Sequence, residues 1–217
     1  MEQDRSNRTQ LVVIRHGETE WNVRGIWQGQ QNSPLTDQGM RQAKAVAERL
    51  REFPVAAVYS SDLGRCIQSA QPTVDALSLK LSLDERLRER SFGVLEGMDK
   101  QESQRRYPGI WEELGRKDID FAPEGGESLR QKQTRFEAVF LDLAKRHAGQ
   151  CIAVFTHGGG VDALVRMVLN LNLSAERKYT LWNSALNVVT WEEQHWTLDT
   201  LGDVAHLHGM QSAFRAR

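Results

Sequence analysis

Two histidines stand directly after short apolar runs that lie far apart in the chain. His16 follows the run 11–14 and a single arginine, Arg15, whereas His157 closely follows the run 151–155. Such short runs, rich in β-branched residues, predict buried strands. Ligands of open α/β sheets bind at the carboxyl ends of strands, so both histidines should belong to one site. The pairing argues against the alternative of a lone histidine that is hydrogen-bonded in the core.

Two further segments could contribute to the same chemistry. Residues 60–65 (Ser-Ser-Asp-Leu-Gly-Arg) follow a predicted strand and open a predicted helix, where backbone N–H groups favour an anion. Arg65 could add a bidentate clamp, although a surface arginine on a capped helix is the alternative. Glu89 lies in a loop and could act as a general acid. It also belongs to the charge run 84–90, and such runs are usually solvated.

Two other kinds of site fit the sequence less well. Gly158, Gly160 and Ala163 follow the spacing of a dinucleotide fingerprint, with Glu176 near the expected acidic position. The match lies late in the chain, however, and Glu176 falls in a loop-like stretch. An anion site at the same helix start requires no cofactor.

A metal site is the second of these alternatives. The available ligands are His16, His157, His206 and His208, and their spacing matches no zinc or iron pattern. His206 and His208 are typical of a surface pair.

The elements that would position these residues alternate between strand and helix. This alternation predicts an α/β fold, a three-layer α/β/α sandwich whose central sheet is mainly parallel and covered on both faces. The closing strands are expected to bring one antiparallel edge. The predicted strands are 11–14, 55–59, 80–83, 151–155, 186–190 and 196–200; the predicted helices begin at Thr36 or Asp37, at Leu63, at Ser128 and at Gly160.

Length and composition limit the possible classes of protein. We predict one domain over residues 1–217, with a flexible tail at 1–9 and an irregular lid or small insertion at 97–125. The formal net charge is −1, which argues against broad binding of nucleic acids or membrane surfaces. No apolar stretch approaches the length of a membrane span. Cys66 and Cys151 are expected to be reduced core residues, as in a cytoplasmic protein.

Taken together, these segments resemble the histidine phosphatase superfamily, the phosphoglycerate-mutase-like proteins. The resemblance runs in the family's order from residue 11 to about residue 170, and so covers most of the chain. The matching residues are Arg15-His16-Gly17-Glu18-Thr19 with Asn22, Ser60-Ser61-Asp62-Leu63 with Arg65, Glu89 before Phe92-Gly93, and Thr156-His157-Gly158-Gly159.

The resemblance implies a role for each of these residues. His16 would be the nucleophile that becomes phosphohistidine, and Glu89 would be the proton donor to the leaving oxygen. Arg15, Arg65 and His157 would form a cationic pocket around the phosphate. No metal or organic cofactor is implied. Further hydrogen bonds to the substrate are expected from Asn22, Gln28, Gly29 and Gly158.

The physics of phosphoryl transfer is consistent with these roles. Such transfer needs positioning and charge neutralisation above all. Cations near His16 should lower the pKa of its imidazole and keep the ring neutral and nucleophilic. The other ring nitrogen must then donate its proton, and a backbone carbonyl is the expected acceptor.

Within this family the sequence favours a phosphomonoesterase that acts on a small phosphorylated metabolite. The insertion before His157 is modest, and Tyr107, Trp111 and Phe121 are expected to line the pocket. Residues 123–128 (Pro-Glu-Gly-Gly-Glu-Ser) resemble the phosphatase branch. Gln28-Gly29 does too, because a mutase would more often carry a threonine there.

Other functions remain as alternatives. A phosphoglycerate mutase would be favoured if cations of the insertion faced the pocket and held a second acidic group; these are Arg105, Arg106, Arg116 and Lys117. A non-catalytic relative that binds a phosphorylated ligand, and a phosphatase acting on phosphoproteins, are the other candidates. A homodimer is possible, and the turn 182–185 is a candidate for the pocket wall.

Overall fold

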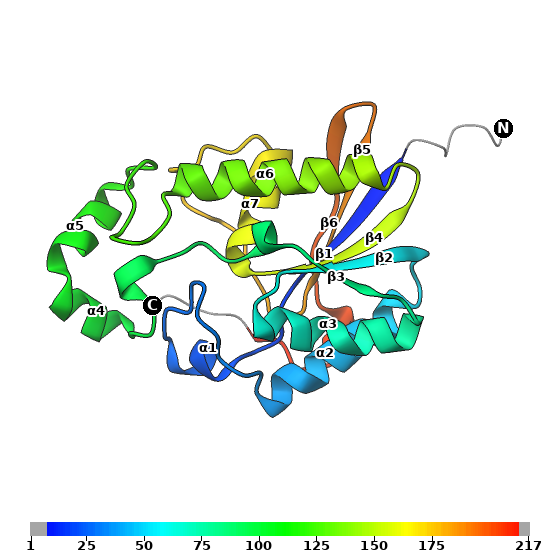
Figure 1. Ribbon diagram of the computed structural model, residues 1–217, viewed down its shortest axis with the longest axis horizontal. Coiled ribbons are helices and arrows are strands. Elements are labelled where there is room, and N and C mark those ends of the chain that lie inside the picture. The colour runs from blue at the N-terminus through cyan, green and yellow to red at the C-terminus, as the bar shows by residue number, and fades with distance from the viewer. Residues whose placement is uncertain (1–7, 213–217) are drawn as a thin grey trace.

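The computed structural model describes residues 8–212, and at its centre is a six-stranded β-sheet between two layers of helices (Figure 1). In space the strands follow the order β3-β2-β4-β1-β5-β6. Strands β1 to β4 pair in parallel, whereas β5 is antiparallel to both of its neighbours. The strands span Thr9–Arg15 (β1), Val55–Ser60 (β2), Leu81–Leu83 (β3), Cys151–Thr156 (β4), Leu186–Glu192 (β5) and His195–Asp203 (β6).

Strands β1 and β4 lie at the centre of the sheet because both of their faces are apolar. All side chains of the runs 11–14 and 152–155 are fully buried. The two strands pair in a register that sets Arg15 opposite Thr156. The next backbone N–H, that of His16, donates to the Thr156 carbonyl at 2.9 Å. Both strands therefore end at the same level of the sheet.

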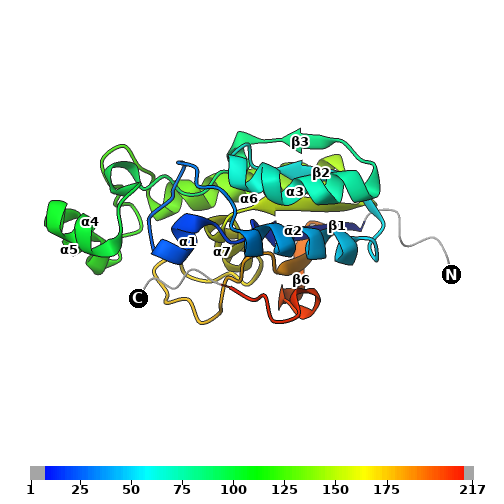
Figure 2. The same cartoon turned by 90° about the horizontal axis from the view of Figure 1, so that it is seen from below.

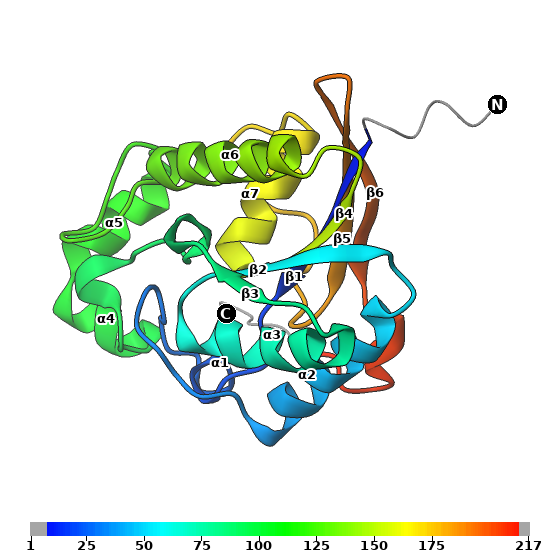
Figure 3. The same ribbon diagram turned by 45° about the vertical axis from the view of Figure 1, so that its right-hand side comes forward.

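Helices cover both faces of the sheet. α6 and α7 pack on one face, and α2 and α3 pack on the other (Figure 3). Viewed from below, α2 and α3 lie side by side against the sheet (Figure 2). Within residues 8–212, none of the helices is long and apolar enough to cross a bilayer. The helices span Glu20–Arg24 (α1), Asp37–Leu50 (α2), Gly64–Leu77 (α3), Lys100–Arg106 (α4), Pro108–Arg116 (α5), Leu129–Arg146 (α6) and Gly158–Val168 (α7).

The three-layer α/β/α sandwich predicted from the sequence is confirmed, and so are two of its helix starts. The Thr36 hydroxyl accepts a hydrogen bond from Gly39 N at the start of α2, and the Ser128 hydroxyl accepts one from Gln131 N at the start of α6. α7 begins at Gly158, two residues before the predicted start. The glycines of this turn are therefore its first helical residues.

The margins of the sheet differ from the expectation in two details. The antiparallel strand is β5, inside the sheet, and the edge is formed by β6. Thr9 was expected in a flexible tail, but it is the first residue of β1 and is fully buried. Its hydroxyl donates to the Ala144 carbonyl at 3.0 Å, which ties the strand to the end of α6. Residues 1–7 lie outside the described part of the chain.

Segment 97–125, expected to be irregular, contains the helices α4 and α5. Asp99 caps α4 by accepting a hydrogen bond from Glu102 N, and Pro108 occupies the first position of α5. The many charged residues of this segment made the helix signals hard to recognise in the sequence. The two helices lie at one end of the molecule, beyond the carboxyl ends of the central strands (Figure 1).

Candidate active site

His16 lies at the carboxyl end of β1 and lines a pocket of about 260 Å³. Its Nδ1 is 2.7 Å from the Gly17 carbonyl oxygen, so Nδ1 carries the proton and Nε2 keeps its lone pair. Burial holds the pKa of His16 well below its ordinary value, and Arg65 and Arg15 lower it further. The ring is neutral, as the sequence predicted, but the main cause is burial and the cations come second.

Arg15 and Arg65 approach the same pocket and are held by backbone carbonyls. Arg15 Nη1 donates to the Leu181 carbonyl, whereas Arg65 donates to those of Gln31 and Gly29 at 2.6 and 2.7 Å. Burial lowers the pKa of Arg15 only to about 10, so it stays charged at neutral pH. Among the described residues, the buried Nε atoms of both arginines have no partner. These two donors remain available to an anion.

His157 lies behind His16, at the equivalent end of β4. The two imidazole centroids are 5.3 Å apart, and His157 Nε2 is 2.9 Å from the Ser61 hydroxyl. Burial, followed by Arg65, holds the pKa of His157 well below its ordinary value. In the free protein His157 is therefore neutral, and the arginines alone carry the positive charge that was expected of all three residues.

Glu89 faces this pocket from the loop that follows β3. One carboxylate oxygen accepts Gly159 N at 2.9 Å, and the other accepts Arg90 N at 2.8 Å. A Cβ at position 159 would lie 2.0 Å from the Glu89 carboxylate, so a larger residue there would displace that side chain. A Cβ at Gly158 would lie 3.6 Å from Arg15 Nε and 3.8 Å from the Glu89 carboxylate. The start of α7 thus passes close to both side chains.

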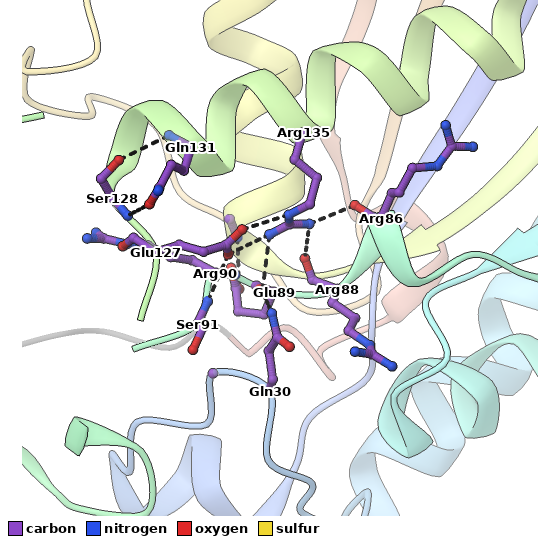
Figure 4. Close-up of polar contacts among 12 residues, drawn as sticks. Gln30, Arg86, Arg88, Glu89, Arg90, Ser91, Glu127, Ser128, Gln131 and Arg135 are labelled. Carbon is purple, nitrogen blue, oxygen red and sulfur yellow. Dashed lines mark hydrogen bonds and ion pairs between the residues drawn. The ribbon is translucent and has the colours of Figure 1, made fainter. Parts of the chain in front are cut away.

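The loop that carries Glu89 is held by a single guanidinium, that of Arg135 on α6 (Figure 4). Arg135 donates to the carbonyls of Arg86 and Arg88 at 2.7 and 2.8 Å, and to that of Glu89 at 3.4 Å. It also forms a two-pronged ion pair with Glu127, at 2.8 and 2.7 Å. The position of Glu89 is therefore fixed from the helix as well as from the start of α7.

The remaining predicted site residues surround the same space. Gln28 Nε2 donates to the Thr19 hydroxyl at 2.8 Å, and Gln28 Oε1 is buried without a partner among the described residues. Asn22 belongs to the short helix α1, which the sequence analysis missed, and forms a capping box with Thr19. All predicted site residues except His157 line the pocket: Arg15, His16, Asn22, Gln28, Gly29, Arg65, Glu89 and Gly158.

Several pocket residues were missed by sequence reasoning. The turn 182–185 does not line the pocket, so that expectation is wrong, but Asn183 Nδ2 donates to the His16 carbonyl at 2.9 Å and fixes the backbone there. Arg90, Lys132, Asp162 and Arg177 also line the pocket. Their charged types carry no signal of burial in the sequence, because charged residues on helices and loops are usually solvated.

The apolar wall comes from residues other than those expected. Trp27 and Phe92 line the pocket, with ring centroids 4.8 Å apart. Tyr107, Trp111 and Phe121 do not line it, so that expectation is wrong. Trp111 instead packs against Trp27, at 6.1 Å between centroids, and supports the wall from the side of α5.

The cations of the insertion do not face His16. Arg106 pairs with Glu102 and Arg116 with Glu113, each within its own helix. Arg105 is exposed, and only Lys117 lines a second pocket beside the first. The other cations of the insertion are therefore solvated surface charges.

The two alternative kinds of site were also compared with the structure. Within residues 8–212, no group of three or more His, Cys, Asp or Glu side chains is placed to hold a metal ion. His206 Nε2 is 3.0 Å from the Ser184 carbonyl oxygen. At the glycine-rich start of α7, the space beside Gly159 is filled by Glu89, which leaves none there for a pyrophosphate.

Comparison with known proteins places this arrangement in a family. Residues 11–204 match the histidine phosphatase superfamily (branch 1), and the chain belongs to that superfamily. Its fold is the phosphoglycerate-mutase-like fold. Members of the superfamily are phosphatases or mutases, so the protein is an enzyme of this broad group.

Particular relatives differ in the activity that their names state. "Probable phosphoglycerate mutase GpmB" of Enterobacter sp. (strain 638) is 36% identical over 209 residues, covering 91% of this chain and 94% of the relative. YhfR of Bacillus stearothermophilus superposes with a TM-score of 0.85 at 29% identity, covering 92% of this chain and 99% of that one. Mycobacterial glucosyl-3-phosphoglycerate phosphatase superposes with a TM-score of 0.76 at 27% identity, covering 90% and 99%.

Proposed function

We propose that this protein is a phosphomonoesterase that hydrolyses a small phosphorylated metabolite through a phosphohistidine at His16. One observation carries the proposal: a neutral imidazole, with Nδ1 held by the Gly17 carbonyl, faces a pocket beside two charged arginines with unpartnered Nε atoms. A neutral nucleophile next to a preformed anion site is what phosphoryl transfer requires.

In the first step the phosphoryl oxygens are held by Arg15 and Arg65, which neutralise their charge. The lone pair on His16 Nε2 attacks phosphorus, and the bond to the ester oxygen breaks as the new P–N bond forms. Glu89, in its protonated form, gives its proton to the departing oxygen and so releases an alcohol. The proton stays on Nδ1, which donates to the Gly17 carbonyl throughout, and this hydrogen bond stabilises the charge that develops on the ring.

In the second step water hydrolyses the phosphohistidine. Glu89, now a carboxylate, removes a proton from the water as its oxygen attacks phosphorus. The P–N bond breaks and its electron pair returns to Nε2, which restores the neutral imidazole. Inorganic phosphate leaves, and Glu89 is again protonated. The backbone N–H groups of Gly159 and Arg90 hold the carboxylate in one place for both transfers.

Hydrolysis of a small molecule is favoured by the form of the pocket. Its wall of Trp27 and Phe92 suits the organic part of a metabolite, and the arginines of the insertion point elsewhere. The similarity to glucosyl-3-phosphoglycerate phosphatase supports this choice. We place the enzyme in the cytoplasm, which is consistent with its buried free cysteines, Cys66 and Cys151.

A phosphoglycerate mutase is the second candidate, because the curated relative at 36% identity is named as one. Such an enzyme returns the phosphoryl group to a second hydroxyl of the substrate instead of passing it to water. The same nucleophile and the same acid–base carboxylate would serve both reactions.

The test follows both reactions in one vessel. The protein is incubated with 3-phosphoglycerate, primed with 2,3-bisphosphoglycerate, and with a panel of other small phosphomonoesters. Released phosphate and 2-phosphoglycerate are measured together. Phosphate release that exceeds isomerisation is expected. Isomerisation faster than release would establish the mutase, and neither reaction with any ester would contradict both candidates.

A further inference from the structure

We propose that the enzyme holds a second acidic group of its substrate between Lys132 and Arg90, at the junction of two pockets. A second pocket of about 450 Å³ adjoins the pocket around His16. Both are lined by Arg90, Leu129, Lys132 and Asp162. The inference rests on the proposed function, because it concerns the part of a phosphomonoester that lies beyond the phosphoryl group.

Lys132 is the unusual member of this junction. Only 4% of its side chain is exposed, although it lines both pockets. It stands in the first turns of α6, close to Ser128 at the helix start, where the helix dipole disfavours a cation. Lysine is rarely buried without a role that offsets the lost hydration. Helix formation therefore does not account for a lysine here.

Lys132 shares its buried carboxylate partner with a second cation. Asp162 accepts from Lys132 Nζ at 3.3 Å, from Arg166 Nε at 3.0 Å and from the Tyr179 hydroxyl at 2.9 Å. One carboxylate is thus shared by two cations and a hydroxyl. Arg166 is further held by two backbone carbonyls of the loop that follows α7, those of Asn172 and Ala175. Arg166 lines the second pocket but is held in place by these contacts, whereas Lys132 lines both pockets.

Arg90 provides the second arm of the junction. It is almost fully buried, its Nε donates to the Glu127 carbonyl at 2.8 Å, and its guanidinium lies over the Phe92 ring. These contacts fix one edge of the guanidinium. Arginine and lysine together match a carboxylate or a phosphate better than either does alone, because one offers a planar fork and the other a point charge.

The junction lies on the side from which the leaving group departs. Lys132 and Glu89 both line the pocket around His16, and the Glu89 carboxylate opposes the lowering of the Lys132 pKa by burial. Glu89 is the proposed proton donor to the leaving oxygen, so the organic part of the substrate emerges beside Lys132. The substrate class is therefore a phosphomonoester whose alcohol carries a carboxylate or a second phosphate a few bonds away.

The test compares three ligands: glycerol 3-phosphate, 3-phosphoglycerate and propane-1,3-diol bisphosphate. The first has no second acidic group, the second has a carboxylate and the third a second phosphate. Dissociation constants are measured by calorimetry in the His16→Ala background, where no turnover occurs. The variant is Lys132→Met, which keeps the chain length but removes the charge. Lys145→Met, on the exposed end of α6, is the matched control.

We expect one acid-bearing ligand or both to bind more tightly than glycerol 3-phosphate. Lys132→Met should reduce that preference by about 10- to 100-fold, since hydrogen bonds between charged groups are the strong ones. Whichever preference falls more identifies the acidic group. Lys132→Arg should restore part of it, and Lys145→Met should leave it unchanged.

An equal loss for all three ligands, or no loss, would overturn the inference. Arg90→Gln is the second variant, and it keeps the inference testable if Lys132→Met unfolds. This variant should lower the same preference. Because these are binding measurements, the distal site could be confirmed even if no ester were hydrolysed. Conversely, hydrolysis without any preference would leave the proposed function intact and remove the inference.

Discussion

The ends of β1 and β4 carry the same motif, a buried strand followed by histidine and glycine, yet they supply different things. At the end of β1, His16 turns its Nδ1 to its own backbone and presents Nε2 to the pocket. At the end of β4, His157 is fully buried against Ser61 and does not line the pocket. The first exit offers a reactive atom, and the second offers mainly a frame.

The frame at the end of β4 reaches the acid–base loop at two points. The Thr156 hydroxyl donates to the Leu87 carbonyl at 2.8 Å, and Gly159 N donates to the Glu89 carboxylate. The end of β4 therefore positions the backbone of the loop, and the start of α7 orients the Glu89 carboxylate. The same motif therefore has two roles here, because the hydrogen-bond partner of each imidazole decides whether a ring nitrogen is free to react.

The largest effect should come from His16→Ala. Without the nucleophile no phosphohistidine can form, and turnover should fall by roughly four orders of magnitude or more. The check is rapid mixing with a radioactive phosphomonoester, an alkaline quench and measurement of the label on the protein. An unchanged melting temperature would show that the fold is intact. Labelled protein with near wild-type turnover would show that His16 is not the nucleophile.

Glu89→Gln tests the proposed general acid, which the segment after β4 holds in position. Turnover of alkyl phosphates should fall by roughly 10²- to 10⁴-fold, since an alkoxide needs a proton to leave. Phosphorylation of His16 by p-nitrophenyl phosphate should fall much less, because that leaving group is stable as an anion. Burst kinetics with the two kinds of ester separate these steps. An equal loss for both would count against Glu89 as the acid.

His157→Asn tests whether the two histidines have different roles. The variant removes the imidazole that packs behind His16 and contacts Ser61, so His16 is less well positioned and kcat should fall by about 10²-fold. The labelled phosphoenzyme should still form, only more slowly, in contrast to His16→Ala. If label were absent from both variants alike, the two strand ends would have to share the nucleophilic role.

Gly159→Ala tests the support of Glu89 by the start of α7. The added Cβ would lie 2.0 Å from the Glu89 carboxylate, so the side chain must shift. We expect about a tenfold loss of kcat for alkyl phosphates, because a displaced acid is less well aligned. The matched control is Gly115→Ala in α5, where a Cβ meets no atom within 4 Å. Full activity in Gly159→Ala would mean that Glu89 needs no support from α7.

The smallest effect concerns stability against pH. Burial holds the pKa of both His16 and His157 well below their ordinary 6.5. Below about pH 6.5 the unfolded chain therefore binds more protons than the folded one. As the pH decreases through this range, the free energy of unfolding should decrease by up to about 1.4 kcal/mol per pH unit for each histidine. Urea unfolding at several pH values measures the slope, which His157→Asn should reduce by about half.

Much of the fold and of the reacting centre could be predicted from the sequence. The runs 11–14 and 151–155 predict central strands because nothing polar interrupts them, and strand ends locate sites in parallel sheets. Arg65 and Glu89 were found through the resemblance to a family, since each taken alone has a surface alternative. The predicted partner of His16 Nδ1 followed from elementary acid–base reasoning.

Other parts of the site could not be predicted, because they depend on contacts between distant segments. Lys132 sits among ordinary charges of an amphipathic helix, and only the packing of α6 against α7 shows that it is buried beside Asp162. The aromatic wall was assigned to Tyr107 and its neighbours, whereas Trp27 and Phe92 form it from two loops. A local pattern cannot show which of several aromatic residues turns inward.

The pairing of β1 with β4 also determines when the site can exist during synthesis of the protein. His16 leaves the ribosome long before its partner strand β4 and His157. Asn183, which fixes the His16 backbone, follows later still. Contacts between such distant segments form late and slowly. A nascent chain that ends before β4 therefore carries the nucleophile without a pocket, and catalytic activity begins only after β4 and Asn183 have been made.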